Sequence, residues 1–318
     1  MISLSAADDA ATGRDLDRAC RSAGAFAVVD HGLPAELVAD AIEVSQRFFA
    51  LPAAAKDRYR VECPAGVRRG YQRLGAEAQA AAAGRVTGRD RSETFCLGPL
   101  RDPAIDDVWA VADVWPDADL PEMRVVLRRY RTAVDLLGRR LLRLAALLLR
   151  GDACAFNSLV TQPLGGLRAN HYPALTSALP DGTWRAGPHT DYSLFTLLAS
   201  DGRPGLEILV DGAWLPVDVP PGALLVNVGD VLAQVSRGEW HSPWHRVGTP
   251  TGGGQIPART TLAFFSYPNA DVVVPGLRLG GDAQATAGDY LREKVSLLFG
   301  EAEPCRLPSS PSLSARPG

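Results

Sequence analysis

Residues 206–228 read LEILVDGAWLPVDVPPGALLVNV, and this stretch decides the fold class. It holds three short apolar runs separated by turn residues, and Asp211-Gly212 between the first two runs is a strong signal for a two-residue β-hairpin. Eight short strands with turns and no helices between them favour an antiparallel sandwich or jelly roll. The five further apolar runs that complete this set cover residues 167–172, 195–199, 244–247, 260–267 and 272–274.

The first half of the chain has a helical texture instead. Between residues 121 and 150, apolar side chains recur every three or four positions, which predicts one long helix or two consecutive helices. Residues 76–91 are rich in Ala, Gly and Arg, and we expect a loop or a poorly ordered helix there. The fold class is therefore α+β, with a β core packed against N-terminal and central helices. Further helices are expected over 15–23, 34–50 and 289–299, and a strand over 25–29.

These changes of texture divide the chain into four regions. Residues 1–110 are expected to form an N-terminal region of helices and strands, and residues 111–160 the helices that back the core. The β core spans residues 161–275. Residues 276–318 hold the last helix and a tail, which is rich in Pro and Ser and is expected to be mobile.

The amino-acid composition limits which kinds of molecule the protein is expected to bind. The chain has 318 residues, of which 46% are hydrophobic and 22% charged, so it can bury the core of one large domain or two modest ones. The 33 basic and 36 acidic residues leave a formal charge of −3, whereas a nucleic-acid-binding protein usually carries a basic surplus. The five cysteines form no CxxC pair, which argues against a disulfide framework and against a thiolate zinc site.

No membrane or export signal stands out in the sequence. The most apolar helix candidate, residues 134–149, contains three arginines and is too short and too charged to span a bilayer. The N-terminal residues MISLSAADDA lack the basic and then apolar pattern of a signal peptide. We therefore expect a cytoplasmic protein, with a monomer favoured, that acts on a small molecule and has no nucleic-acid or membrane partner.

A candidate metal site begins with His189-Thr190-Asp191, which opens the run HTDYSLFTLL. In a strand, residues i and i+2 point to the same face with their Cα atoms about 6–7 Å apart, so one imidazole and one carboxylate can converge on a single ion. The third ligand is expected to be His245 in WHRVGT, with His241 as a competitor in the same segment. Two histidines and one carboxylate on one face leave three open positions, as in the facial triad of non-haem Fe(II) oxygenases.

A second cluster follows in ARTTLAFF. Arg259 and Thr261 share a strand face, and a guanidinium beside a hydroxyl is well suited to bind a carboxylate. The two remaining histidines are interpreted as structural. His31 in DHGLP is expected to cap the following helix, and His171 should face away from Asn170 and Tyr172.

Nine segments carry a family resemblance by their order and spacing. They are GAFAVVDHGLP, RFFALPAAAK, RRGYQRLGAE, ETFCLGP, LRANHYP, HTDYSLFTLL, LLVNVGD, WHRVGTP and RTTLAFFSYPN. Each segment is a weak motif by itself, but the ordered set is highly specific. Together they resemble the isopenicillin N synthase-like branch of the Fe(II)/2-oxoglutarate-dependent dioxygenases, and the likeness covers most of the chain.

The resemblance implies a double-stranded β-helix, or jelly roll, packed against helices. It also implies an oxidoreductase that uses Fe(II), O₂ and 2-oxoglutarate, releases succinate and CO₂, and hydroxylates, desaturates or cyclises a small molecule. No catalytic side chain is implied beyond the metal ligands. The implied Fe(II) ligands are His189, Asp191 and His245, and the implied 2-oxoglutarate contacts are Arg259, Thr261, Tyr172 and Asn170. Thr261 stands where the family usually has Ser, which keeps the hydroxyl and adds a methyl group.

The substrate is less defined by the sequence. Aromatic and basic side chains near the motifs are compatible with a small anionic or amino-acid-like substrate, and they are Arg68, Tyr71, Phe95, Phe195 and Trp240. A composition rich in Ala and Arg, with only two lysines, is typical of a GC-rich bacterium and points to specialised metabolism such as antibiotic biosynthesis.

Three alternatives stay open at the level of the sequence. Isopenicillin N synthase itself uses no 2-oxoglutarate, and its equivalent Arg and Ser bind the carboxylate of the substrate, so a 2-oxoglutarate-independent Fe(II) oxidase is the first of them. A zinc hydrolase could use the same three ligands, although no general base accompanies them. A β-barrel that only binds a small molecule is the third alternative.

Overall fold

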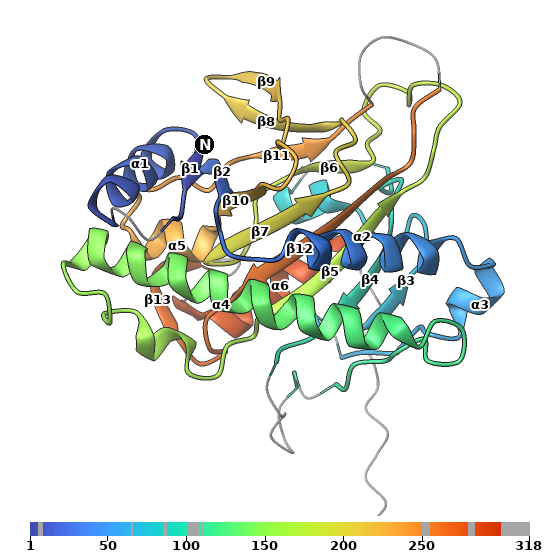
Figure 1. The fold of residues 1–318 in the computed structure, drawn as a ribbon, viewed down its shortest axis with the longest axis horizontal. Helices are drawn as coiled ribbons and strands as arrows, with labels where there is room; N and C mark the ends of the chain where they lie inside the picture. Colours follow the sequence, from blue (N-terminus) through green and yellow to red (C-terminus); the bar gives the residue numbers. More distant parts are fainter. Residues whose placement is uncertain are drawn as a thin grey trace, which may run out of the picture.

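A large antiparallel sheet forms the centre of the molecule (Figure 1). The computed structural model describes residues 1–5, 9–64, 66–84, 88–100, 108–109, 111–249, 255–278 and 284–299. Within these ranges the main sheet has eight strands, and only its edge pair β1 and β2 is parallel. Their order across the sheet is β1 (Ile2–Ser3), β2 (Ala25–Val29), β10 (Leu224–Val228), β7 (Phe195–Ser200), β12 (Arg259–Ser266), β5 (Gly166–Tyr172), β4 (Glu93–Leu97) and β3 (Gly70–Gln72).

A smaller sheet lies over one face of the main sheet and completes the predicted jelly roll. Its strands, in spatial order, are β6 (Ala186–His189), β11 (His245–Val247), β8 (Leu206–Val210) and β9 (Ala213–Pro216). The β8–β9 hairpin turns at Asp211-Gly212, where both residues have positive φ angles of 50° and 80°. Two positive φ angles match a type I′ turn, so the hairpin expected at this dipeptide is confirmed.

Helices cover the other face of the main sheet. The long helix α4 (Glu122–Arg150) packs against β7 and β12, and α2 (Ala35–Phe49) packs against α4 and against the same sheet. The expected long helix is thus one continuous helix, and it ends at Gly151, whose φ of 72° provides a left-handed C-cap. No helix in the described ranges is long and apolar enough to cross a membrane.

Strand β12 contributes side chains to the core on one face of the main sheet and to a cavity on the other face. Leu262 and Phe264 are buried in the core under the helices, whereas Thr261, Ala263 and Phe265 line a cavity on the side of the smaller sheet. Successive side chains of a strand point to opposite faces, and both faces of this strand are covered, so none of its side chains is exposed to solvent. The cavity between the two sheets therefore forms part of the core architecture.

The remaining elements are short or terminal. They are α1 (Asp9–Ser22), α3 (Ala53–Asp57), the 3₁₀ turns η1 (Gln79–Ala83) and η2 (Asn157–Val160), α5 (Asp230–Val235), β13 (Val273–Arg278), β14 (Gln284–Thr286) and α6 (Ala287–Leu298). In the described part of the segment 76–91, one 3₁₀ turn forms where we expected a loop or a poorly ordered helix. The tail beyond residue 300, which we expected to be mobile, lies outside the described residues.

Candidate active site

Three side chains from the smaller sheet and its outgoing loop converge beside the cavity. His189 is the last residue of β6, and His245, the first residue of β11, is its antiparallel partner in register. Asp191 lies two residues beyond the end of β6, in the connection to β7. One ligand atom from each of these residues lies within 4.8 Å of the others. The expected arrangement of His189 and Asp191 within one strand is therefore corrected: the strand ends at the histidine, and the loop that follows brings the carboxylate to the same place.

Hydrogen bonds orient each of the three side chains. The Nδ1 atoms of His189 and His245 lie 2.7 and 3.1 Å from the carbonyl oxygens of Gly187 and Pro243, respectively, so each ring donates from Nδ1 and leaves Nε2 free. Nε2 of His245 lies 3.8 Å from Oδ1 of Asp191. The other oxygen of Asp191, Oδ2, accepts a hydrogen bond of 3.1 Å from the amide of Asn227. Two imidazole nitrogens and one carboxylate oxygen are thus turned toward a common point.

The electrostatics of the cluster suit a metal ligand set. Burial, followed by the neighbouring His245, lowers the pKa of His189 to about 3. The imidazole is therefore neutral near pH 7, which is the form that coordinates metals. Two nitrogen donors and one oxygen donor, with supporting hydrogen bonds behind them, fit a divalent transition metal such as Fe(II).

The other candidate histidines lie elsewhere. His241 is exposed and does not belong to the cluster, so the geometry favours His245 as the third member. His171 stacks on Phe49 with ring centroids 5.1 Å apart, on the face of β5 turned away from the cavity. The expectation that His31 caps the following helix is wrong, because its Nδ1 accepts from the backbone of Leu33 and α2 begins without a side-chain cap.

A second group of candidates lies on the neighbouring strands of the main sheet. Arg259 pairs in register with Tyr172, and Thr261 pairs with Asn170, whose amide donates a 3.2 Å hydrogen bond to the threonine hydroxyl. All four side chains line the same cavity as the three-residue cluster. The structure therefore brings together the predicted cosubstrate residues and the predicted metal ligands.

Arg259 has guanidinium N–H donors that form no hydrogen bond with the described residues. Its side chain is almost fully buried, its guanidinium carbon lies 5.4 Å from the centroid of the Tyr172 ring, and its Nε donates to the backbone carbonyl of Arg203 at 3.1 Å. Within the described part of the chain, no carboxylate forms an ion pair with it. Burial lowers the pKa of Arg259 from its ordinary value, but an arginine stays charged. A buried cation that faces a cavity without a counterion is prepared to bind an anion.

Of the five substrate candidates, only Arg68 lines the cavity. Tyr71 and Phe95 pack around Phe48 in the core, with ring centroids 5.9 and 4.7 Å away. Phe195 and Trp240 pack on each other in the core, and the indole of Trp240 donates to Asp17. The expectation for these four aromatic residues is thus corrected.

The physical reason for this correction is the alternation of strand side chains. A strand directs successive side chains to opposite faces, and an aromatic residue suits a core face as well as a cavity face. In β4, the cavity receives Cys96, and Phe95 beside it points into the core.

Several cavity residues escaped the sequence reasoning. Trp109, Arg168, Tyr192 and Tyr267 line the cavity, and Asn227 supports Asp191. For Arg168 a signal was present, because in LRANHYP it lies two residues before Asn170 and therefore on the same strand face. From the C-terminal side, Leu291, Val295 and Leu298 of α6 add apolar wall.

Comparisons with known proteins agree with this architecture. Residues 164–268 match the model of the 2OG-Fe(II) oxygenase superfamily, and residues 1–118 match the N-terminal region of a non-haem dioxygenase in morphine synthesis. Validamycin A dioxygenase from Streptomyces hygroscopicus subsp. limoneus is 30% identical over 277 residues, which cover 84% of this chain and 75% of that protein. A homoarginine-6-hydroxylase from Arabidopsis thaliana is 29% identical over 307 residues, covering 90% and 89%.

A solved structure extends the likeness to three dimensions. A full-length Neurospora crassa protein crystallised in complex with alpha-KG superposes with a TM-score of 0.80 at 25% identity. The superposition covers 93% of this chain and 95% of that chain. The likeness therefore includes both the helices and the two sheets.

Proposed function

Because the chain belongs to the 2OG-Fe(II) oxygenase superfamily, we propose that His189, Asp191 and His245 bind its Fe(II) and that Arg259 and Thr261 bind the distal carboxylate of its 2-oxoglutarate. The protein is a 2-oxoglutarate-dependent dioxygenase, and it oxidises a small molecule. One observation carries the residue assignment. Three oriented donor atoms lie within 4.8 Å of one another, and the same cavity is lined by a buried arginine that has no counterion among the described residues.

Bound Fe(II) supplies the activation of O₂, which is coupled to the conversion of 2-oxoglutarate into succinate and CO₂. The side chains of this protein hold the reactants in place. The carbonyls of Gly187 and Pro243 fix the two imidazole rings, and the amide of Asn227 fixes the carboxylate of Asp191. Such fixed ligands need little rearrangement when a metal binds.

The cosubstrate end of the cavity works through charge and exclusion of water. Arg259 neutralises a carboxylate in a buried place, where a charge-assisted hydrogen bond is strong. The hydroxyl of Thr261 is held by Asn170 and offers a further hydrogen bond, and Tyr172 adds a phenol close to the guanidinium. Elsewhere in the lining, the apolar side chains of α6 limit the access of water to the cavity.

The finer assignment concerns the substrate and the setting of the reaction. We propose a specialised or amino-acid-derived metabolite that is hydroxylated, desaturated or cyclised, since similar proteins include a validamycin A dioxygenase and a homoarginine-6-hydroxylase. We also propose that the enzyme is a cytoplasmic monomer. The free cysteines Cys20, Cys63, Cys96 and Cys154 support a reducing compartment.

An anaerobic absorbance titration tests the assignment of the site. The apoprotein receives Fe(II) and then 2-oxoglutarate, and a visible charge-transfer band is expected only when both are present. The band should be lost in His189→Ala and should need much more 2-oxoglutarate in Arg259→Met. If the wild-type protein binds iron but gives no band, the alternative of a 2-oxoglutarate-independent oxidase replaces this proposal.

A further inference from the structure

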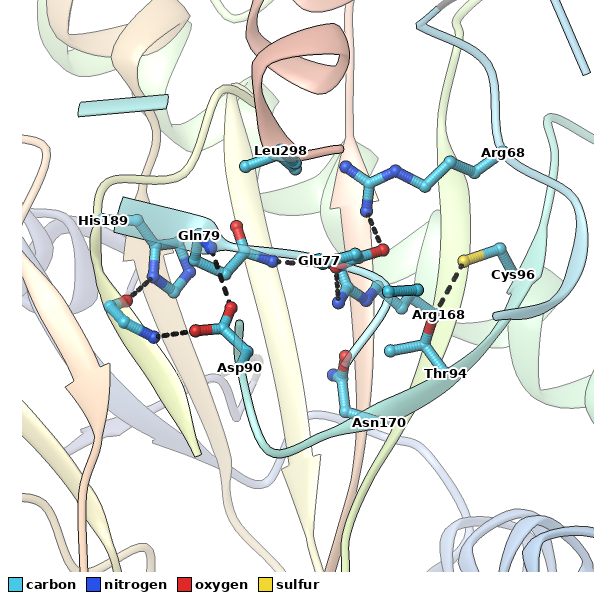
Figure 2. A network of polar contacts seen from close by, with 12 residues as sticks. Arg68, Glu77, Gln79, Asp90, Thr94, Cys96, Arg168, Asn170, His189 and Leu298 are labelled. Carbon is cyan, nitrogen blue, oxygen red and sulfur yellow. Dashed lines mark hydrogen bonds and ion pairs between the residues drawn. The ribbon is translucent and has the colours of Figure 1, made fainter. Parts of the chain in front are cut away.

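The same cavity has a second group of basic side chains, separate from Arg259. Figure 2 shows Arg68 and Arg168 on either side of Glu77. The arginines donate to the two oxygens of this carboxylate, Arg68 at 2.7 Å and Arg168 at 2.5 Å. Arg68 lies two residues before β3, Arg168 lies in β5, and Glu77 lies in the loop before η1. Three separate segments of the chain thus build one buried cluster, which we call the arginine pair with its carboxylate.

The arginine pair has donors that nothing in the described structure uses. Within the described ranges, each guanidinium makes one hydrogen bond, to Glu77, and the Nε atoms of both are buried without a partner. The hydroxyl of Tyr192 is also buried without a partner. All three residues line the cavity. Buried donors cost free energy when they stay unpaired, so their presence in the lining of one cavity points to a ligand that offers acceptor oxygens.

The charge of the cluster is one positive unit. Burial opposes the ionisation of Glu77, but Arg168 and Arg68 outweigh burial and hold the pKa of its carboxyl below the ordinary value of 4.5. Two permanent cations therefore line the cavity near pH 7, with one carboxylate bound to both of them. The nearby Asp90 does not cancel this charge by an ion pair, because its two oxygens accept from the backbone nitrogens of Gln79 and Gly187. A single carboxylate group on a ligand would make the place neutral.

The position of the pair relative to the metal ligands indicates which reactant it meets. Tyr192, whose hydroxyl is free, directly follows Asp191 in the chain. Arg168 pairs in register with Ala263 of β12, whereas Arg259, the proposed cosubstrate arginine, pairs with Tyr172 at the far end of β5. The cavity lining thus includes the arginine pair and Arg259 beside one set of metal ligands; Arg69 also lines it, but its three guanidinium nitrogens donate to the backbone carbonyls of Val111, Arg68 and Trp109. Arg259 is assigned to 2-oxoglutarate, and the arginine pair is left for the molecule that is oxidised.

We propose that Arg68 and Arg168 bind a carboxylate of the substrate, so that the substrates of this enzyme are small monocarboxylic acids, including amino acids. The inference rests on the proposed function, because the substrate place is defined by the metal ligands and by Arg259. Glu77 acts as a positioning residue: it holds both guanidinium groups at the wall and limits their net charge to what one carboxylate neutralises.

The test uses the full-length enzyme loaded anaerobically with Fe(II) and saturating 2-oxoglutarate. Small aliphatic and aromatic monocarboxylic acids are added one at a time, each matched by its primary amide, which has a similar shape and no charge. Binding is read from the change that each compound causes in the visible band, and turnover is read separately as succinate release after O₂ is admitted. Acids are expected to bind and to stimulate succinate release. Their amides are expected to bind at least about tenfold more weakly than the acids.

Variants test whether the preference for acids over amides depends on Arg68 and Arg168. Arg68→Met and Arg168→Met should each weaken binding of the active acids about tenfold or more, with the Fe(II)/2-oxoglutarate band intact. Arg68→Lys keeps a charge and should retain the preference for acids over amides. Glu77→Gln should strengthen binding of acids, because it removes the competing carboxylate, whereas a purely structural cluster would give no such gain. Arg129→Met, on the exposed face of α4, is the matched control and should change nothing.

The outcomes separate the two proposals. If the band never forms in the wild-type protein, the proposed function fails first. If the band forms but amides bind as well as acids, or no acid binds, the inference about the substrate is overturned and the function stands. The inference about the substrate is likewise overturned if Arg68→Met and Arg168→Met leave the binding of acids unchanged.

Discussion

Replacing Arg259 by Met should separate cosubstrate binding from metal binding. Among the described residues, the guanidinium makes one hydrogen bond, from Nε to the carbonyl of Arg203 at 3.1 Å, so its two Nη groups are left for a carboxylate. A hydrogen bond to a charged group contributes about 1.5–3 kcal/mol, and each 1.4 kcal/mol is about a factor of ten in affinity. If one such bond is lost, the dissociation constant of 2-oxoglutarate rises about 10- to 100-fold, and if both are lost it rises further.

The assay is the anaerobic titration of the visible band with 2-oxoglutarate at saturating Fe(II). The affinity for Fe(II) should stay the same in Arg259→Met, because Arg259 makes no hydrogen bond to the metal-ligand cluster. Arg203→Ala is a matched control: it removes an exposed arginine side chain next to the site but keeps the backbone carbonyl that holds Arg259. A dissociation constant in Arg259→Met within about twofold of the wild-type value, well below the loss expected for a charged hydrogen bond, would refute the role assigned to this residue.

The remaining predictions concern the metal ligands and the buried charges. His189→Ala and Asp191→Ala should lose Fe(II) binding, measured by equilibrium dialysis, whereas His241→Ala should bind Fe(II) normally; retention in the first two would disprove the triad. Asn227→Leu removes the hydrogen bond to Asp191 and should weaken Fe(II) binding about 10- to 100-fold in the same assay, and an unchanged affinity would show that the bond does not support the ligand. The pKa of Glu77 is lowered on folding, so Glu77 stabilises the fold above its ordinary pKa of 4.5, and this contribution is lost as the pH falls from there through the folded value. Denaturant unfolding from pH 7 to pH 3 should therefore show a smaller loss of stability in Glu77→Gln than in the wild-type protein, and equal losses would contradict the assignment.

Local patterns in the sequence were enough to predict the fold class and much of the site. The Asp211-Gly212 turn depends on two adjacent residues with positive φ angles, and the long helix α4 depends on a spacing that is visible in its own residues. Arg259 and Thr261 share a strand face because they are two residues apart in β12. Each of these features is determined within a few residues, so a single sequence contains its signal.

Features that depend on contacts between distant segments could not be predicted in the same way. The short strand β6 lacks an alternating apolar pattern of its own and forms because β11 pairs with it. The side of β4 on which Phe95 lies depends on its register with β5. The arginine pair with its carboxylate needs the loop before η1, the residues before β3, and β5 to meet, and no motif in any one of them shows this.

The place of β2 in the main sheet has a consequence for how the chain is made. β2 is hydrogen-bonded to β10, and β10 to β7, so β2 reaches the sheet centre only through a strand about 200 residues later. This is a long-range contact of the kind that slows folding. During synthesis, Phe26 and Val28, which are buried in the finished molecule, emerge long before their partner Val226 and its neighbours. The side of β2 that pairs with β10 must therefore stay without its partner, or be shielded by a chaperone, until the β-rich half of the protein has been translated.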